Sequence, residues 1–225
     1  MQPPLLALEH ITFAYDAAHP LFQDLNLTLH EGEHMGFFGH NGQGKTSLFR
    51  LITGLERPSS GTIAFQGTPV VTEQDFQTLR RRTGFVLQHA EDQLFCPTVL
   101  DDVAFGLLNL GLSADEARER SLAQLASLGL AGFEDRLTHR LSGGEKKLVS
   151  LAGVLVMEPQ LLLFDEPTST LDPRARERLQ DIITDLPQAR IIISHDRRFL
   201  EATSDRFMTL RDGRIVHTDC ASFFA

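Results

Sequence analysis

Cysteine is scarce in this chain of 225 residues, and basic residues are outnumbered by acidic ones. The two cysteines, Cys96 and Cys220, form neither a close pair nor a metal-ligand spacing, which argues against a disulfide framework and a zinc site. This low cysteine content predicts a protein that functions in a reducing compartment. With 21 Lys and Arg against 30 Asp and Glu, the formal net charge is −9. Because nucleic-acid binding usually needs a basic face, we expect no nucleic-acid partner.

Long apolar runs are also missing. The longest are short pieces such as Leu151–Met157 and Leu161–Phe164, well below the ~20 residues that a membrane helix needs. The N-terminal MQPPLLALEH lacks the basic start and apolar core of a signal peptide. We therefore expect a chain that does not itself cross a bilayer, while its 42% apolar content predicts a substantial buried core.

Short apolar segments alternate with segments of helical spacing, and no repeat or linker interrupts them. This order predicts an α/β fold with a mostly parallel sheet covered on both faces. We expect a single domain over residues 1–225, with a core from 1–90 and 142–225 and an inserted helical lobe at 91–141. The predicted strands are Leu5–Phe13, Leu25–Leu29, Met35–Phe38, Thr62–Phe65, Phe85–Gln88, Leu161–Phe164, Arg190–Ser194 and a terminal hairpin at Phe207–Val216. The predicted helices outside the lobe are Lys45–Thr53, Ser142–Met157, Arg174–Leu186 and Arg197–Ala202.

A glycine-rich segment, Gly39–Thr46, lies between a predicted strand and a predicted helix. It matches the G-x-x-x-x-G-K-[ST] pattern of phosphate-binding loops, a fuller match than a plain glycine turn would need. Glycines let backbone N–H groups converge on phosphate oxygens, and the helix adds its positive N-terminal end. Lys45 is expected to reach the β- and γ-phosphates and Thr46 to offer a hydroxyl to Mg²⁺. The candidate nucleotide-binding residues in this segment are Gly39, Asn41, Gly42, Gly44, Lys45, Thr46 and Ser47.

Two acidic residues, Asp165 and Glu166, follow the apolar run Leu161–Phe164. An isolated Asp-Glu pair usually belongs to a solvated loop. Here it follows a buried strand, and ligands gather at the carboxyl ends of strands in open α/β sheets. We therefore expect Asp165 to hold Mg²⁺ and Glu166 to orient and deprotonate a water that attacks the γ-phosphate.

Two further polar residues end predicted strands. His195 follows the apolar run Ile191–Ile193, which predicts that it lies within reach of the γ-phosphate rather than at an ordinary surface position. Gln88 ends the predicted strand Phe85–Gln88 and is a candidate contact for Mg²⁺ and the attacking water. The basic run Arg80–Arg82 is expected to be a solvated face.

The segment LSGGE at residues 141–145 opens a predicted helix, and alone it indicates only a Ser/Gly helix start. Taken in order with the phosphate loop, Gln88, LLLFDEP, STLD at 169–172 and His195, it resembles the nucleotide-binding subunit of ABC transporters. The resemblance covers essentially the whole chain. It implies a P-loop NTPase fold of the ABC ATPase type, with a RecA-like core, an N-terminal antiparallel β subdomain and a helical lobe.

The resemblance also implies how a nucleotide is held. Two subunits, identical copies or this chain and a paralogue, would pack head-to-tail, and each ATP would lie between two chains. One chain would supply the phosphate loop and the other Ser142, Gly143 and Gly144. Asp172 would link the two sites, and Tyr15 would stack on adenine, the alternative being a strand-edge aromatic. ATP and Mg²⁺ are the implied cofactors, and ATP hydrolysis coupled to transport is the implied activity.

A finer resemblance is to ATPases of energy-coupling factor importers, and among these to those serving cobalt or nickel uptake. It is carried by DQLF at 92–95, DVAFG at 102–106, LNLGLS at 108–113 and LSGGEKK running into LAGVL. The sequence departs from the usual pattern at Glu145, at His89–Glu91 and at Ser169–Thr170, but no chemical group that the mechanism needs is lost. An importer of a vitamin or other solute, or a soluble ABC ATPase, is the alternative.

The family implies integral membrane partners, including a substrate-capture protein, and a peripheral position on the cytoplasmic face of the cell membrane. A short helix of the membrane subunit would lie in a groove between sheet and lobe. Packing in the lobe core is the alternative role for its candidate lining, which is Leu94, Phe95, Val99 and Phe105. Other P-loop classes fit less well: a kinase has no use for LSGG, and a regulatory module without hydrolysis would not need Glu166 or His195.

Overall fold

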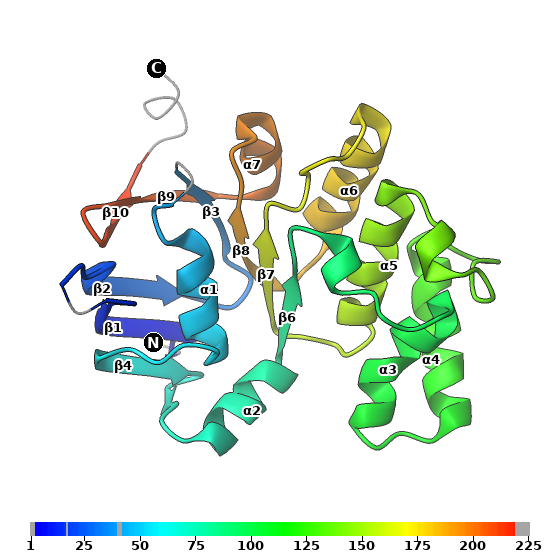
Figure 1. Cartoon of the computed structure of the whole chain (residues 1–225), viewed down its shortest axis with the longest axis horizontal. Helices are drawn as coiled ribbons and strands as arrows, with labels where there is room; N and C mark the ends of the chain where they lie inside the picture. Colours follow the sequence, from blue (N-terminus) through cyan, green and yellow to red (C-terminus); the bar gives the residue numbers. More distant parts are fainter. Residues whose placement is uncertain (1–2, 17, 40–41, 219–225) are drawn as a thin grey trace.

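The computed structural model describes residues 3–16, 18–39 and 42–218. Its larger sheet contains β3 (His34–Phe38), β6 (Thr83–Val86), β7 (Leu161–Asp165), β8 (Ala189–Ile193), β9 (Arg206–Arg211) and β10 (Arg214–His217). The strand order is β10-β9-β3-β8-β7-β6 (Figure 1). All neighbours pair in parallel except β9 and β10. Parallel pairing brings the carboxyl ends of β3, β7 and β8 to the same edge of the sheet.

A second, antiparallel sheet has four strands in the order β2-β1-β4-β5. The strands are β1 (Leu6–Phe13), β2 (Phe22–Leu29), β4 (Ser60–Phe65) and β5 (Thr68–Pro69). Strand β2 alternates buried and exposed residues along most of its length, as expected for a sheet with one solvated face. Helix α1 (Lys45–Thr53) packs into the core that this sheet shares with the larger one (Figure 1).

Alternating side chains of the larger sheet belong to two hydrophobic cores. Leu161 and Leu163 of β7 pack with α1 and the antiparallel sheet. Leu162 and Phe164, on the other face, pack with the helices beyond. Because successive strand side chains point to opposite faces, the apolar run of β7 reflects burial on both faces. The position of Asp165 and Glu166 is therefore fixed by packing on both sides of the strand.

The remaining helices are α2 (Glu73–Arg81), α3 (Val99–Asn109), α4 (Ala114–Ser127), α5 (Gly143–Leu155), α6 (Pro173–Asp185) and α7 (Arg197–Thr203). Helices α3, α4 and α5 lie together at the end of the molecule away from β1 and β2 (Figure 1). Two of these helices begin at a serine N-cap: Ser113 caps α4 and Ser142 caps α5. In the described part of the chain, no helix combines the length and apolar character needed to cross a bilayer.

The predicted fold class, a mostly parallel sheet with an added antiparallel sheet and helices, is confirmed. Strand β6 ends at Val86, so the expectation that Gln88 ends this strand is wrong and Gln88 lies in the following loop. Helix α2 was not predicted, and Arg80 is not simply solvated, because its guanidinium donates to Thr53 O at 3.0 Å. The division into a core and a lobe at residues 91–141 stays a prediction, since α5 packs on both α3 and α4.

Candidate functional site

A cavity of about 490 Å³ lies where β7 and β8 end and α1 begins. Its lining brings together segments that are more than 100 residues apart in the sequence, so only the folded sheet can assemble it. Among the described residues of the wall, most were predicted, and the two that were not are Leu21 and Ile193. The predicted residues in the lining are Tyr15, Gly42, Gly44, Lys45, Thr46, Ser47, Gln88, Asp165, Glu166 and His195.

The phosphate-loop segment enters α1 through Gly44, whose φ of 92° lies in the left-handed region. A Cβ at this position would also come within 2.9 Å of Leu21, so glycine is needed for both conformation and space. The Lys45 ammonium donates to Gly39 O at 2.7 Å. Burial lowers the pKa of Lys45, and the charges of Glu166 and Asp165 act in the opposite direction. Asn41, another predicted contact, lies outside the described residues.

A hydroxyl and a carboxylate meet at the start of α1. Thr46 Oγ1 donates to Asp165 Oδ2 at 2.8 Å. Burial raises the pKa of Asp165, and the hydrogen bond from Thr46 opposes that shift. Mg²⁺ prefers hard oxygen ligands, often one or two carboxylates beside substrate phosphates. The pair therefore fits the predicted magnesium position.

The next residue, Glu166, has a φ of 46°, which is uncommon for a residue with a side chain. Its backbone N–H donates to Ile193 O at 2.8 Å, and its carboxylate contacts His195 Nδ1 at 2.8 Å. The His195 side chain is 73% exposed, whereas that of Glu166 is 9% exposed. The carboxylate is thus held at the cavity wall while the imidazole faces the open side.

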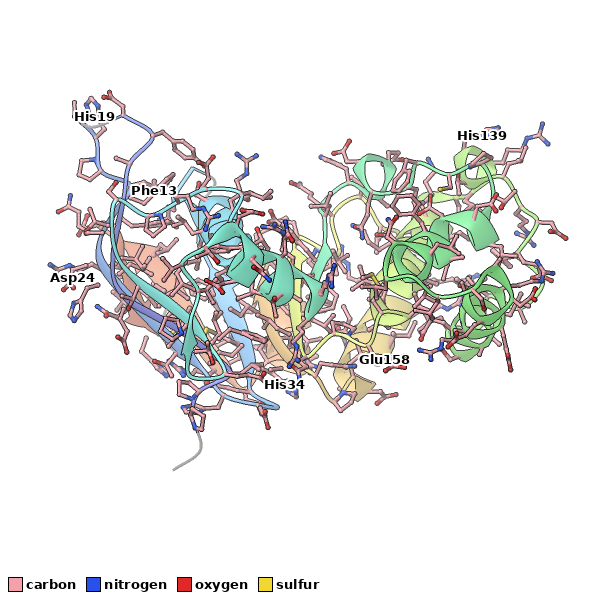
Figure 2. The ribbon with its side chains drawn as sticks, turned by 90° about the horizontal axis from the view of Figure 1, so that it is seen from below. Phe13, His19, Asp24, His34, His139 and Glu158 are labelled. Carbon is pink, nitrogen blue, oxygen red and sulfur yellow. The ribbon has the colours of Figure 1, made fainter. Side chains whose placement is uncertain are left out.

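The predicted signature residues lie elsewhere. Ser142 caps α5: the Glu145 N–H donates to Ser142 Oγ at 3.3 Å, and the Ser142 N–H donates to Glu145 Oε2 at 2.8 Å. Ser142 and Gly143 are exposed, and neither they nor Gly144 belong to the cavity wall. Figure 2 shows Phe13 and His139 in opposite halves of the molecule. Phe13 contacts Tyr15 of the cavity wall, and His139 lies shortly before the signature in the sequence. The nucleotide cavity and the signature of one chain are therefore separated in space.

A family model for ABC transporters matches residues 22–169. The chain belongs to the ABC transporter ATP-binding family. It is 41% identical to the cobalt import ATP-binding protein CbiO of Rhodobacter capsulatus, over 97% of this chain and 80% of the relative. It is 36% identical to the energy-coupling factor transporter ATP-binding protein EcfA of Methanothermobacter thermautotrophicus, over 94% of this chain and 70% of the relative.

A solved structure of this family has the same fold. The structure of cbiO1 from Clostridium perfringens, described as part of the ABC transporter complex cbiONQ, superposes with a TM-score of 0.87 at 34% identity. The match covers 99% of this chain and 91% of the other. The protein is therefore an ABC ATPase, an enzyme family in which ATP hydrolysis is coupled to transport.

Tyr15 borders the cavity of this ABC ATPase at the antiparallel-sheet end. Tyr15 is 59% exposed, and its ring packs edge-on against Phe13 with 4.8 Å between ring centroids. Its hydroxyl donates to Ser47 Oγ at 3.1 Å. An exposed ring beside the start of α1 offers a free face to a flat ligand, so the predicted adenine contact fits this position.

Gln88 is exposed at the cavity, and the loop that carries it is fixed by its backbone. Lys147 Nζ donates to Leu87 O and to Gln88 O, each at 2.8 Å. Burial lowers the pKa of Lys147 to about 8, and the charges of Glu91 and Asp165 oppose that shift. Lys147 was not predicted as a functional residue, although it belongs to the LSGGEKK motif, because a lysine three residues after Gly144 gives no sign of which carbonyls it reaches.

Asp172 lies in the loop between Glu166 and α6 and faces solvent. Its carboxylate caps α6 by accepting the N–H groups of Arg174 and Ala175 at 2.9 and 3.1 Å. Gly144 lies against the same helix start, where a Cβ would come within 2.8 Å of Ala175 Cβ. The signature and the Asp172 loop are therefore neighbours in one chain, outside the nucleotide cavity.

A second hollow, of about 220 Å³, lies between α2 and β6 on one side and α3 and α5 on the other. Phe95 and Phe105 line it, with exposed rings in edge-on contact at 4.6 Å between centroids. Two expected lining residues do not belong to it. Val99 is completely buried, and Leu94 packs against the helical core, because both face the interior of the α3–α5 group.

Proposed function

We propose that this ABC ATPase is the ATP-hydrolysing subunit of an energy-coupling factor importer, and that it works as a dimer with two shared nucleotide sites. The observation that carries the proposal is the separation of the two motifs. The cavity holds the phosphate loop and the acids, while Ser142–Gly144 form an exposed helix start outside it. A helix N-terminus attracts phosphate, so a second subunit could bring this end to the open side of the cavity.

Within each site, the chain would first hold the triphosphate. The N–H groups of the phosphate loop and the Lys45 ammonium would bind the β- and γ-phosphates, and Tyr15 would stack on the adenine. Thr46, Asp165 and Gln88 would hold Mg²⁺, which when bound neutralises charge that develops on the phosphate oxygens. The γ-phosphate side would be closed by Ser142, Gly143 and Gly144 of the second subunit.

Glu166 is the proposed base. Its carboxylate would accept a proton from the water whose oxygen attacks the γ-phosphorus, while the bond to the β-phosphate oxygen breaks and ADP leaves. His195 already contacts this carboxylate at 2.8 Å and would keep it oriented while reaching the γ-phosphate. Asp172, beside Gly144 at the start of α6, would transmit closure between the two sites.

The hollow lined by Phe95 and Phe105 is the proposed contact for a short helix of a membrane subunit. Exposed aromatic rings in a concave site are suited to bury such a helix, and closure of the dimer would then move the membrane subunit. The assembly would also contain a substrate-capture membrane protein. In this arrangement the chain lies at the cytoplasmic face of the membrane without entering it.

Mixing two inactive variants tests the shared site. Ser142→Arg and Glu166→Gln subunits are each inactive as homodimers, but their heterodimer has one intact site and one doubly defective site. An equal mixture should recover about a quarter of wild-type hydrolysis, because half the dimers are mixed and half of their sites are intact. Absence of activity at every mixing ratio, with mixed dimers present on a sizing column, would contradict the proposal.

The cargo is proposed to be cobalt or nickel ions, supported by the identity to a cobalt import ATP-binding protein. The test is purification of the whole transporter from membranes through this chain, followed by uptake of radioactive cobalt, nickel and a vitamin into proteoliposomes. ATP-dependent uptake of either metal supports the proposal. Uptake of only the vitamin would show a different energy-coupling factor cargo, and absence of any membrane partner would favour a soluble ABC ATPase.

A further inference from the structure

Lys147 carries a charge at a buried position, where a charge is energetically unfavourable. It lies on α5, is 3% exposed, and is surrounded by buried residues of the same helix such as Leu148 and Val149. Removing an ammonium from water is unfavourable unless it is fully hydrogen-bonded, and an apolar side chain of similar length would avoid that penalty. Packing of α5 alone therefore does not explain a lysine here.

The acceptors of this ammonium are two successive main-chain carbonyl oxygens. Lys147 Nζ donates to Leu87 O and to Gln88 O, each at 2.8 Å. The first carbonyl belongs to the peptide plane before Gln88 and the second to the plane after it. Because peptide units are planar, fixing both planes leaves the two backbone dihedrals of Gln88 little freedom. The direction in which the Gln88 side chain leaves the backbone is thereby set.

A second segment meets the same carbonyl. Ser169 Oγ, from the loop between Glu166 and α6, donates to Gln88 O at 3.4 Å. The Gln88 carbonyl oxygen, which lies in the loop after β6, is therefore hydrogen-bonded both to α5 and to the loop after β7. Lys147 lies five positions after Ser142, within the first two turns of the same helix. A rigid displacement of this helix end must carry Gln88 with it or break both lysine hydrogen bonds.

We propose that Lys147 is a positioning residue that sets Gln88 in the nucleotide cavity and couples it to the signature end of α5. The inference deepens the proposed function and depends on it. Binding of the signature by a nucleotide on the second subunit would displace α5, and Lys147 would transmit the displacement to Gln88. Lys147 does not itself line the cavity, and its ammonium is linked to the cavity wall through the Gln88 carbonyl oxygen.

The adjacent lysine provides a matched control. Lys146 Nζ contacts the carboxylate of exposed Glu91 at 3.0 Å, in the same loop region but through a side chain. Replacing Lys146 by methionine removes the same charge from the same helix without touching the Gln88 peptide planes. Lys147→Met removes the two carbonyl contacts and retains the length of the apolar stem.

The experiment is a double-mutant cycle in the full chain, with steady-state ATPase rates for wild type, Lys146→Met, Lys147→Met, Gln88→Ala and the Lys147→Met/Gln88→Ala pair. Lys147→Met should lower kcat by about 10- to 100-fold, since a displacement near 1 Å at a reacting site has effects of this size. The KM for ATP should change by less than about threefold, because the phosphate loop is intact. Lys146→Met should stay within about twofold of wild type, because its partner Glu91 is exposed and a single ion pair to an exposed carboxylate contributes little.

The cycle separates positioning from general stability. If Lys147 acts through Gln88, Lys147→Met should reduce kcat by no more than about twofold once Gln88 is alanine. An equal loss in both backgrounds would overturn the proposal, as would kcat for Lys147→Met equal to that of Lys146→Met. Should Lys147→Met fail to fold, as judged by circular dichroism, Lys147→Gln, which removes the charge and shortens the side chain but keeps a polar amide, replaces it in the same cycle.

Glu166→Gln, measured in the same ATPase assay, distinguishes this inference from the proposed function. If wild type hydrolyses ATP and Glu166→Gln abolishes it, the proposed chemistry stands and the cycle judges Lys147 alone. If Glu166→Gln has no effect on hydrolysis, the proposed function fails, and the Lys147 inference falls with it.

Discussion

The nucleotide cavity and the signature end of α5 differ in how their polar groups are partnered. In the cavity, Thr46 and Asp165 are 119 residues apart in sequence and hydrogen-bonded to each other, and Glu166 contacts His195. At the start of α5, Ser142 is exposed and its cap partner, Glu145, comes from the same helix turn. The comparison shows that the phosphate loop and the acids are joined in one cavity within the chain, whereas the signature residues face outwards.

The largest expected effect is on the cavity side. Glu166→Gln keeps the shape of the side chain but removes the proton acceptor, so ATP turnover should fall about 10²- to 10⁴-fold. ATP bound without hydrolysis should hold two chains together, giving an ATP-dependent dimer by size-exclusion chromatography with light scattering. The control is Glu158→Gln, an exposed carboxylate outside the cavity (Figure 2). A Glu166→Gln protein that turns over ATP at the wild-type rate would contradict the assignment.

A smaller effect is expected from the cation of the phosphate loop. Lys45→Ala removes a charge-assisted contact to phosphate, and the Kd for ATP should rise by about 10- to 100-fold. Isothermal titration calorimetry measures this directly. Lys146→Ala, which removes a lysine from outside the cavity, should leave the Kd within about twofold. Equal affinity for ATP in wild type and Lys45→Ala would show that the phosphates are bound elsewhere.

Substitutions at two helix N-caps can distinguish an effect on folding stability from an effect on dimerisation. Ser113→Ala and Ser142→Ala each remove an N-cap side chain and should lower the free energy of unfolding by about 1 kcal/mol, measured by urea denaturation. Of the two, Ser142→Ala alone should weaken the ATP-dependent dimer in a Glu166→Gln background, by about 2- to 10-fold from one lost hydrogen bond. Equal effects of both caps on dimerisation would place the signature outside the interface.

The smallest effect concerns the amino end of β3, opposite the cavity. Burial lowers the pKa of His34, the nearby charge of Arg190 lowers it further, and Asp205 acts in the opposite direction. Because the pKa of His34 is lowered in the folded protein, the unfolded chain binds a proton at this residue more readily below pH 6.5. Protonation of His34 therefore lowers the free energy of unfolding as the pH falls. Between pH 7.5 and 5.5, wild type should lose more unfolding free energy in urea than His34→Gln. ATP affinity at pH 7.5 should be the same in both.

Much of the site could be predicted because its signals are local. The strand, glycine loop and helix that carry Lys45 are contiguous, and so are β7 and the acids that follow it. Helix α2 gives a weaker signal, since only Phe76 and Leu79 of its nine residues are buried. The capping box between Thr72 and Asp75 was the feature that could have revealed it. Patterns of burial identify elements only where enough of their residues are apolar.

Contacts between distant segments could not be predicted in the same way. Val99 and Phe105 belong to one helix and are both apolar, yet Val99 is completely buried and Phe105 faces the hollow beside α2. Which of them is exposed depends on how α3 lies against α5. The two carbonyl contacts of Lys147 join residues 59 and 60 positions apart, and nothing in the spacing of the motif specifies them.

The amino-acid sequence by itself determined the elements and the order of the chemical groups, because turn, cap and burial preferences act over a few neighbouring residues. It therefore specified the phosphate loop, the acids after β7 and the capped start of α5. Only the tertiary structure decided that the first two share a cavity while the third faces outwards. That decision depends on strand order and helix packing, where the hydrophobic effect acts on surfaces brought together from the whole chain.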